Sequence, residues 1–149
     1  MEIQPDFKDL LGLFNAHKVE YIIVGGYALA FHGAPRYTGD IDIYVRPDDK
    51  NAASIMSALE EFGFGSVGLS AEDFGRPGQV IQLGVPPVRV DIITSIAGVS
   101  WDEAFSNRAS GKYGDIQVHF IGRKQFIINK KAVARKKDLA DLEALGEES

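Results

Sequence analysis

The chain has 149 residues, of which 45% are hydrophobic and 25% are charged, as is typical of one soluble globular domain. It contains no cysteine, and its three histidines are scattered, so disulfides, thiolate metal sites and zinc-finger spacings are excluded. The formal net charge of −5 argues against a protein that coats nucleic acid without selectivity.

Hydrophobic periodicity predicts the elements in the first part of the chain. Apolar residues recur at helical spacing in two segments, and compact or alternating apolar runs indicate two strands. Glycines end the first strand, and Gly33 and Pro35 stop the short helix after it. The predicted elements are helix 6–16, strand 21–24, short helix 27–31, strand 40–45 and helix 50–62.

The second part of the chain predicts more strands and helices. A minor helix begins at Ser70, and two strands flank a Pro86-Pro87 turn. Ser100 and Glu103 form a capping-box pattern before a short helix. The predicted elements are strands 80–85 and 88–94, helix 101–105, strand 115–121 and a helical remainder. This order predicts an α/β or α+β fold, in which a central mixed sheet is flanked by helices.

An acidic pair stands on the predicted strand 40–45. Asp40 and Asp42 are two residues apart, so both side chains leave the same face of the strand. Two carboxylates that converge repel each other unless a positive charge lies between them. Oxygen ligands without nearby Cys or His favour Mg²⁺, with Mn²⁺ as a substitute. Taken alone, an Asp-x-Asp pattern also fits an exposed strand or turn.

A third carboxylate, Asp91, lies in an otherwise apolar strand. An ionised carboxylate in a mostly buried strand is costly without a partner. We expect a metal ion shared with Asp40 and Asp42 to be that partner. A salt bridge with Arg89 is not expected, on the reasoning that neighbours on a strand point to opposite faces.

The Gly25-Gly26 pair lies where the first strand becomes a helix. Glycines there let a ligand approach the backbone, and free N–H groups favour an anion, although a tight turn alone also explains them. Arg36 and Thr38 come just before the acidic pair, and Arg36 is either a phosphate ligand, a brace for the carboxylates or a surface arginine. His32 is expected to pack or to cap the short helix.

A basic run follows the last predicted strand. Residues 123–137 carry seven basic residues and no acidic one: Arg123, Lys124, Lys130, Lys131, Arg135, Lys136 and Lys137. The run is either a solvated helical face or a local site for phosphate charge.

Together these motifs resemble the DNA polymerase β-like nucleotidyltransferase superfamily. The resemblance rests on Gly25-Gly26, on Asp40-Ile41-Asp42 and on Asp91 within Val90-Asp91-Ile92. The stretch 24–42 and the ending Arg135-Lys136-Lys137-Asp138-Leu139-Ala140-Asp141-Leu142 resemble small bacterial and archaeal members, which include nucleotidyltransferases of abortive-infection and toxin–antitoxin systems. The resemblance spans residues 21–145.

The resemblance implies one nucleotidyltransferase domain over residues 1–149, with residues 123–145 as a basic helical tail. It implies transfer of a nucleoside monophosphate from a nucleoside triphosphate to an acceptor hydroxyl, with release of pyrophosphate. Asp40 and Asp42 would hold two Mg²⁺ ions, and Asp91 would complete one of them. Gly25 and Gly26 would hold the triphosphate. The implied nucleotide-binding set also includes Arg36, Thr38, Lys136 and Lys137.

Three readings remain open. The chain is an active enzyme that modifies RNA, a protein or a small molecule; a nucleotide-binding module that works with a partner protein, as in a toxin–antitoxin pair; or a structural domain with surface acids. We expect it to be cytoplasmic, because no signal peptide and no apolar run of the roughly 18 residues that span a membrane is visible. The oligomeric state is open, with strand edges and the Trp101 region as candidate contacts.

Overall fold

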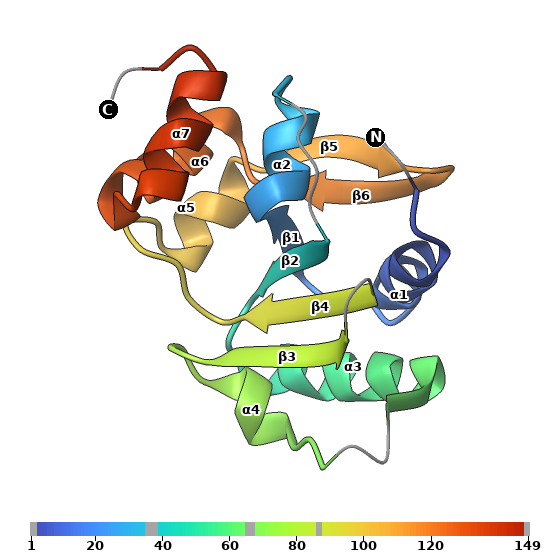
Figure 1. Ribbon diagram of the computed structural model, residues 1–149. Coiled ribbons are helices and arrows are strands. Elements are labelled where there is room, and N and C mark those ends of the chain that lie inside the picture. The colour runs from blue at the N-terminus through green and yellow to red at the C-terminus, as the bar shows by residue number, and fades with distance from the viewer. Residues whose placement is uncertain (1–2, 35–38, 65–67, 86–87, 148–149) are drawn as a thin grey trace.

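The computed structural model describes residues 3–34, 39–64, 68–85 and 88–147 (Figure 1). Six strands form one mixed sheet in the order β3-β4-β2-β1-β6-β5, which confirms the predicted fold class. The strands are β1 (Tyr21–Val24), β2 (Asp40–Val45), β3 (Val80–Val85), β4 (Val88–Ile93), β5 (Ala109–Tyr113) and β6 (Ile116–Phe120). The helices are α1 (Pro5–Ala16), α2 (Gly25–Phe31), α3 (Asp49–Leu59), α4 (Ala71–Gly75), α5 (Trp101–Ser106), α6 (Arg123–Val133) and α7 (Lys136–Ala144).

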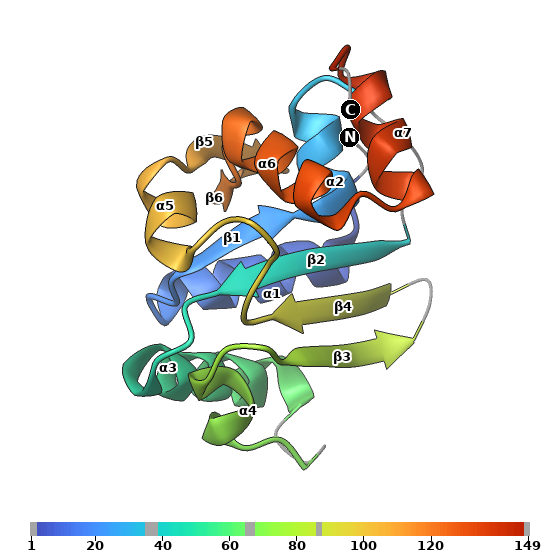
Figure 2. The ribbon, with the colours of Figure 1, turned by 90° about the vertical axis from the view of Figure 1, so that its left-hand side faces the viewer.

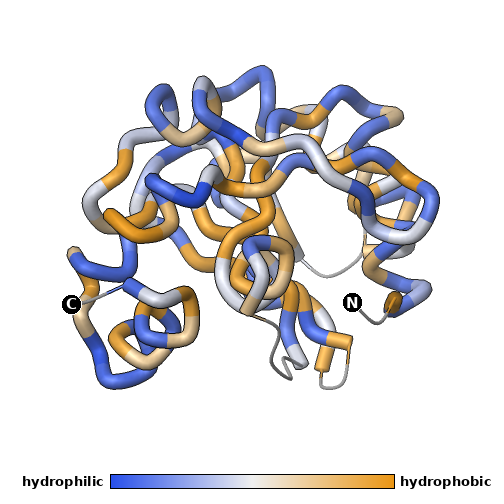
Figure 3. Tube along the Cα trace, turned by 90° about the horizontal axis from the view of Figure 1, so that it is seen from above, coloured by the Kyte–Doolittle hydropathy of each residue, from blue (hydrophilic) through white to orange (hydrophobic). Residues whose placement is uncertain are grey.

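The core forms where the apolar faces of the helices meet the central strands. All four residues of β1 are buried, and α1 contributes Phe7, Leu10, Leu11 and Phe14, which share one helical face. Figure 2 shows α1 behind β1 and β2, with α2, α6 and α7 gathered above these strands. Seen from above, hydrophobic and hydrophilic stretches alternate along the helices (Figure 3), as amphipathic helices around a core require.

The pairing of the two acid-bearing strands decides where the site lies. β1 pairs antiparallel with β2, while β2 pairs parallel with β4, although α3, α4 and β3 separate these two strands in the sequence. Because residues in register on neighbouring strands share a face of the sheet, this pairing sets the side chains of β2 and β4 beside each other.

Three elements differ from the sequence-based expectation. The helix predicted for residues 50–62 is α-helical only to Leu59 and continues as a π-helical turn, η1 (Glu60–Phe64), with Gly63 at φ 111°. The helical remainder is two helices, because Ala134 adopts a left-handed conformation at φ 57° that ends α6. β5 was not predicted. Its sequence Ala-Ser-Gly-Lys-Tyr lacks β-branched residues, and it forms by antiparallel pairing with β6.

The structure also bears on the predicted helix cap at Ser100 and on the surroundings of Trp101. The Ser100 hydroxyl accepts a hydrogen bond from the Glu103 backbone N–H at 3.2 Å, so the predicted cap of α5 is confirmed. Trp101 is only 8% exposed and packs against Tyr44 and Phe105, so its side chain belongs to the core. The Pro86-Pro87 turn lies outside the described residues. None of the described helices is both long enough and apolar enough to cross a membrane.

Candidate active site

The structure brings the three predicted carboxylates together on one face of the sheet. In the parallel register of β2 and β4, Asp42 is the direct partner of Asp91, and Asp40 is the partner of Arg89. Asp40 and Asp42 alternate with the buried residues Ile41 and Ile43, so they share the face opposite to that part of the core. Asp91 therefore does not lie on the far side of the sheet from the acidic pair.

Arg89 is a site residue that the sequence reasoning excluded, and that exclusion was wrong. Residues two apart on a strand share a face, so Arg89 and Asp91 point the same way. The Arg89 guanidinium donates from Nε to Asp91 Oδ1 and from Nη2 to Asp91 Oδ2, both at 3.0 Å. The same Nη2 lies 3.0 Å from Asp40 Oδ2. This contact with Asp91 raises the pKa of Arg89, which therefore stays charged.

The carboxyl group of Asp42 is held in an unfavourable electrostatic environment. Burial raises the pKa of its carboxyl to about 6, and the negative charges of Asp91 and Asp40 add to the increase. The positive charges of Lys137 and Lys130 act in the opposite direction. A carboxylate held among other carboxylates in this way is a common feature of sites that bind a cation.

The strain on Asp42 makes the stability of the metal-free protein depend on pH. Its folded pKa of about 6 exceeds the ordinary 3.8, so between these values the folded chain keeps a proton that the unfolded chain has lost. In EDTA, we expect the free energy of unfolding to fall as the pH rises through this window, by about 1.4 kcal/mol per pH unit at most. Urea unfolding of wild type and Asp42→Asn across the window isolates this contribution, because the variant lacks it. Parallel pH profiles for the two proteins would contradict the assignment.

The glycine turn lies directly against the acidic strand. Gly25 has φ +67°, and a Cβ atom added there would overlap with the Asp42 carboxylate. Gly26 follows it in the first turn of α2. A side chain at position 25 would therefore be disfavoured both by the backbone and by the neighbouring acid.

Gly25→Ala tests this close approach. We expect it to lower the free energy of unfolding by more than about 1 kcal/mol, since alanine is strained at positive φ and its methyl group would displace Asp42. Gly12→Ala is the matched control, because Gly12 lies in α1 with nothing within 4 Å of an added Cβ, and that change should stabilise the helix. Chemical denaturation of both variants measures the difference. Equal effects of the two changes on the free energy of unfolding would contradict the close approach of Gly25 to Asp42.

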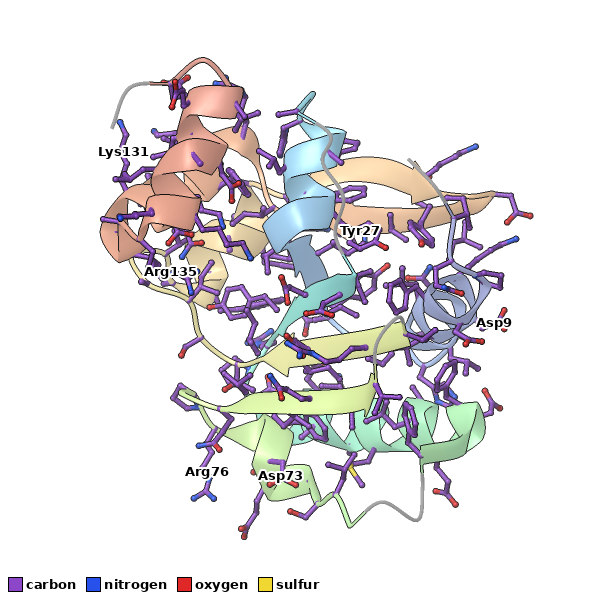
Figure 4. All side chains as sticks on the ribbon, viewed as in Figure 1. Asp9, Tyr27, Asp73, Arg76, Lys131 and Arg135 are labelled. Atoms are coloured by element: carbon purple, nitrogen blue, oxygen red, sulfur yellow. The ribbon has the colours of Figure 1, made fainter. Side chains whose placement is uncertain are left out.

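The basic run divides into internal ion pairs and exposed lysines. Lys130, Arg135 and Arg123 pair with acidic side chains of α7 or of the segment after it. The remaining lysines are exposed: Lys124, Lys131, Lys136 and Lys137. Figure 4 shows Lys131 on the outer side of α6 and Arg135 at the turn between α6 and α7. Because the charges of Lys137 and Arg135 both act on Asp42, the start of α7 adds positive charge to the surroundings of the acidic centre.

A buried ion cluster that the sequence reasoning missed fixes this start of α7. The Lys130 ammonium lies 3.1 Å from Asp138 Oδ1 and 3.2 Å from Asp141 Oδ2, with the three side chains at most 7% exposed. The Arg135 guanidinium and backbone N–H also donate to Asp138. Burial alone would raise the pKa of Asp138, but these hydrogen bonds hold it at about 2. The Asp-x-x-Asp spacing, which puts both acids on one helical face, was the available signal.

Of the remaining residues that the sequence singled out, only His32 lies in the described part of the chain. Arg36 and Thr38 lie outside the described residues, so the structure says nothing of their contacts. His32 packs, as expected: its Nε2 lies 2.7 Å from the Ile121 carbonyl oxygen, and its ring contacts Phe31 and Phe126.

The assignment of Asp40, Asp42 and Asp91 as metal ligands stays a prediction. Among the described residues, no three Asp, Glu or His side chains are arranged to hold a metal ion. Asp40 and Asp91 face the Arg89 guanidinium instead. Three carboxylates on one face, with a cationic group already among them, still fit a hard divalent cation by their chemistry.

A family model described as "Nucleotidyltransferase of unknown function (DUF6036)" matches residues 2–146. The chain belongs to this family. Among curated proteins, the comparison finds no match.

Three solved structures share this fold. A Thermotoga maritima protein (TM1012), provisionally named a nucleotidyltransferase, is 15% identical with a TM-score of 0.59, over 97% of this chain and 93% of that one. The lincosamide antibiotic adenylyltransferase LnuA, bound to lincomycin, is 15% identical with a TM-score of 0.57, over 98% of both chains. The antibiotic-resistance factor ANT(2'')-Ia is 14% identical with a TM-score of 0.60, over 95% of this chain and 80% of its own. At these identities the likeness establishes the fold of the family member.

Proposed function

We propose that this family member transfers a nucleoside monophosphate from a nucleoside triphosphate to an acceptor hydroxyl and releases pyrophosphate. The observation that carries the proposal is the parallel register of β2 and β4, which makes Asp42 and Asp91 direct partners on the face that Asp40 shares. The acceptor is a hydroxyl of RNA, of a protein or of a small molecule. Family membership supports nucleotide transfer as the class of reaction.

In this proposal each part of the site has one task. Asp40, Asp42 and Asp91 would hold two Mg²⁺ ions, or Mn²⁺ in their place. When bound, such ions stabilise the attacking and leaving oxygens of a displacement at phosphorus. The Gly25-Gly26 turn carries no side chains, and Gly25 lies against Asp42, so a phosphate group bound to the backbone of this turn would lie beside the acidic centre.

The exposed lysines at the start of α7 would neutralise the phosphates of the donor and the departing pyrophosphate. Lys136 and Lys137 are exposed, and Lys137 is close enough to Asp42 to lower its pKa. A lysine in that position is a mobile positive charge beside the acidic centre. Arg36 and Thr38 stay in the proposed nucleotide-binding set on the strength of the sequence alone.

Labelled nucleoside triphosphates test the proposal. The full chain is incubated with Mg²⁺, each α-labelled triphosphate in turn, and total cell RNA or total cell protein. ATP is the first donor to try, because one structural neighbour, LnuA, is named an adenylyltransferase. We expect label on one acceptor fraction, lost in EDTA and in Asp42→Asn. If no triphosphate labels any fraction and none binds, the proposed function is wrong.

A second candidate function has one observation in its favour. In the chain by itself, Arg89 bridges Asp40 and Asp91 across the two strands. A partner protein or acceptor that moved Arg89 would then be needed before transfer, as in the partner-dependent nucleotide-binding module. Mg²⁺-dependent triphosphate binding without transfer by the isolated chain would favour this reading over the self-sufficient enzyme.

A further inference from the structure

One positive group lies in the middle of the acidic centre. The Arg89 guanidinium contacts both oxygens of Asp91, and its Nη2 contacts Asp40 at the same distance of 3.0 Å. One nitrogen atom therefore links carboxylates from two neighbouring strands. The side chains involved are between 12% and 33% exposed, so these contacts are partly shielded from water.

The backbone register explains why Arg89 reaches this place. Arg89 is the direct partner of Asp40 across the β2–β4 pairing, and Asp91 lies two residues further along the same strand and on the same face. The fork of the guanidinium matches the two oxygens of a carboxylate, which makes the contact with Asp91 stronger than a single-point ion pair. Arg89 thus offsets part of the repulsion among the three carboxylates in the absence of any ligand.

We infer that Arg89 is the resident counter-cation of the acidic centre and competes with a divalent metal ion for Asp40 and Asp91. The inference rests on the proposed function, because it takes these carboxylates as metal ligands. Arg89 is a positioning residue in this scheme. While the guanidinium is bound, it holds both oxygens of Asp91 and the Oδ2 atom of Asp40 toward itself.

Simultaneous binding of the arginine and the metal ion is opposed by charge. A divalent ion on the same oxygens would lie a few ångströms from the guanidinium, where like charges in a partly shielded site repel strongly. The ion must therefore displace Arg89 from at least one carboxylate. The displaced guanidinium stays near the site because its strand is fixed in the sheet, and the free energy of that displacement lowers the affinity of the free chain for metal.

Binding of Mn²⁺ alone, without nucleotide, tests the inference on the full chain. Isothermal titration calorimetry or the electron paramagnetic resonance signal of free Mn²⁺ gives the dissociation constant. We expect Arg89→Gln to bind Mn²⁺ roughly tenfold more tightly than wild type, since it removes a charge-assisted bidentate competitor. Arg89→Lys, which keeps the charge and loses the fork, should fall between the two.

Arg46→Gln is the matched control. Arg46 also pairs with two carboxylates, Glu20 at 3.2 Å and Asp48 at 2.9 Å, but it follows the opposite end of β2 from Asp40. Its Mn²⁺ affinity should equal that of wild type. Asp42→Asn should bind Mn²⁺ more weakly than wild type, and the double variant Asp42→Asn with Arg89→Gln should bind it more weakly than Arg89→Gln alone. These two losses would assign the measured Mn²⁺ to the acidic centre.

The outcomes separate this inference from the proposed function. Mn²⁺ binding by wild type that is unchanged or weakened in Arg89→Gln would overturn the competition, and the carboxylates would remain metal ligands with Arg89 as a structural brace. If circular dichroism shows that Arg89→Gln is unfolded, the Mn²⁺ affinity of Arg89→Lys replaces it: tighter binding than wild type supports the competition, and unchanged or weaker binding overturns it. Absence of Mn²⁺ binding in every variant would overturn both the inference and the proposed metal role.

Discussion

Asp42→Asn is expected to abolish nucleotide transfer and, at the same time, to stabilise the protein. In the proposed function Asp42 is a metal ligand, so transfer should fall by roughly a thousandfold or more, because the amide cannot replace a charged ligand. Stability should rise because the Asp42 carboxylate of the wild-type protein is ionised near neutral pH although burial and the negative charges of Asp91 and Asp40 oppose its ionisation. The neutral amide of Asn avoids this cost. We expect a gain in the free energy of unfolding of about 1 to 3 kcal/mol at neutral pH in EDTA.

Label transfer and urea unfolding on the same preparations measure both effects. Asp9→Asn is the control, since Asp9 is an exposed acid on α1, which Figure 4 shows on the far side of the molecule from α7. It should change neither quantity measurably. An inactive Asp42→Asn protein that is also less stable than wild type would mean that Asp42 holds the fold together and is not a strained functional group.

Lys130→Met is expected to cause a large loss of stability. Its ammonium is the buried partner of both Asp138 and Asp141. Removal of one member of a buried ion cluster leaves the others charged and poorly solvated, which typically costs about 3 to 5 kcal/mol. Because Arg135 still contacts Asp138, we expect a value near the lower end, about 3 kcal/mol. Urea denaturation followed by circular dichroism gives the difference.

Lys131→Met provides the comparison for that experiment. Lys131 is the next residue in α6 and is exposed, so the same chemical change should alter the free energy of unfolding by less than about 0.5 kcal/mol. Similar losses for the two variants would show that helix propensity or net charge, and not the buried cluster, determines the result.

Local patterns were sufficient to predict much of this protein. The alternation of residues 40–45 and the helical spacing in residues 6–16 are set by backbone geometry within a few residues, and both elements formed as expected. The common face of Asp40 and Asp42 follows from the same alternation. The association of Asp91 with this pair was expected from the cost of a carboxylate in a buried strand and from the family resemblance. The register that makes Asp91 the partner of Asp42 was not predicted, because no local pattern fixes which strands pair.

Two of the features that were not predicted share a different cause, which is the contribution of distant partners. β5 exists because β6 offers it hydrogen bonds, and Gly111 gives Phe31 and Phe120 space to stack. The separate roles of Lys130 and Lys131 depend on how α6 packs against α7, which a run of basic residues does not reveal. The exclusion of Arg89 had another origin, because the alternation rule itself puts Arg89 and Asp91 on one face.

The parallel pairing of β2 with β4 also determines at which stage of folding the three carboxylates come together. Asp40 and Asp42 are made early in synthesis, but Asp91 joins them only after the intervening α3, η1, α4 and β3 have been made and β4 has docked in parallel onto β2. Such long-range parallel contacts form late, because the entropy cost of closing a large loop comes before the stabilising contacts between the strands are made. A partly folded chain in which β4 has not yet paired with β2 therefore carries the acidic pair without its third member.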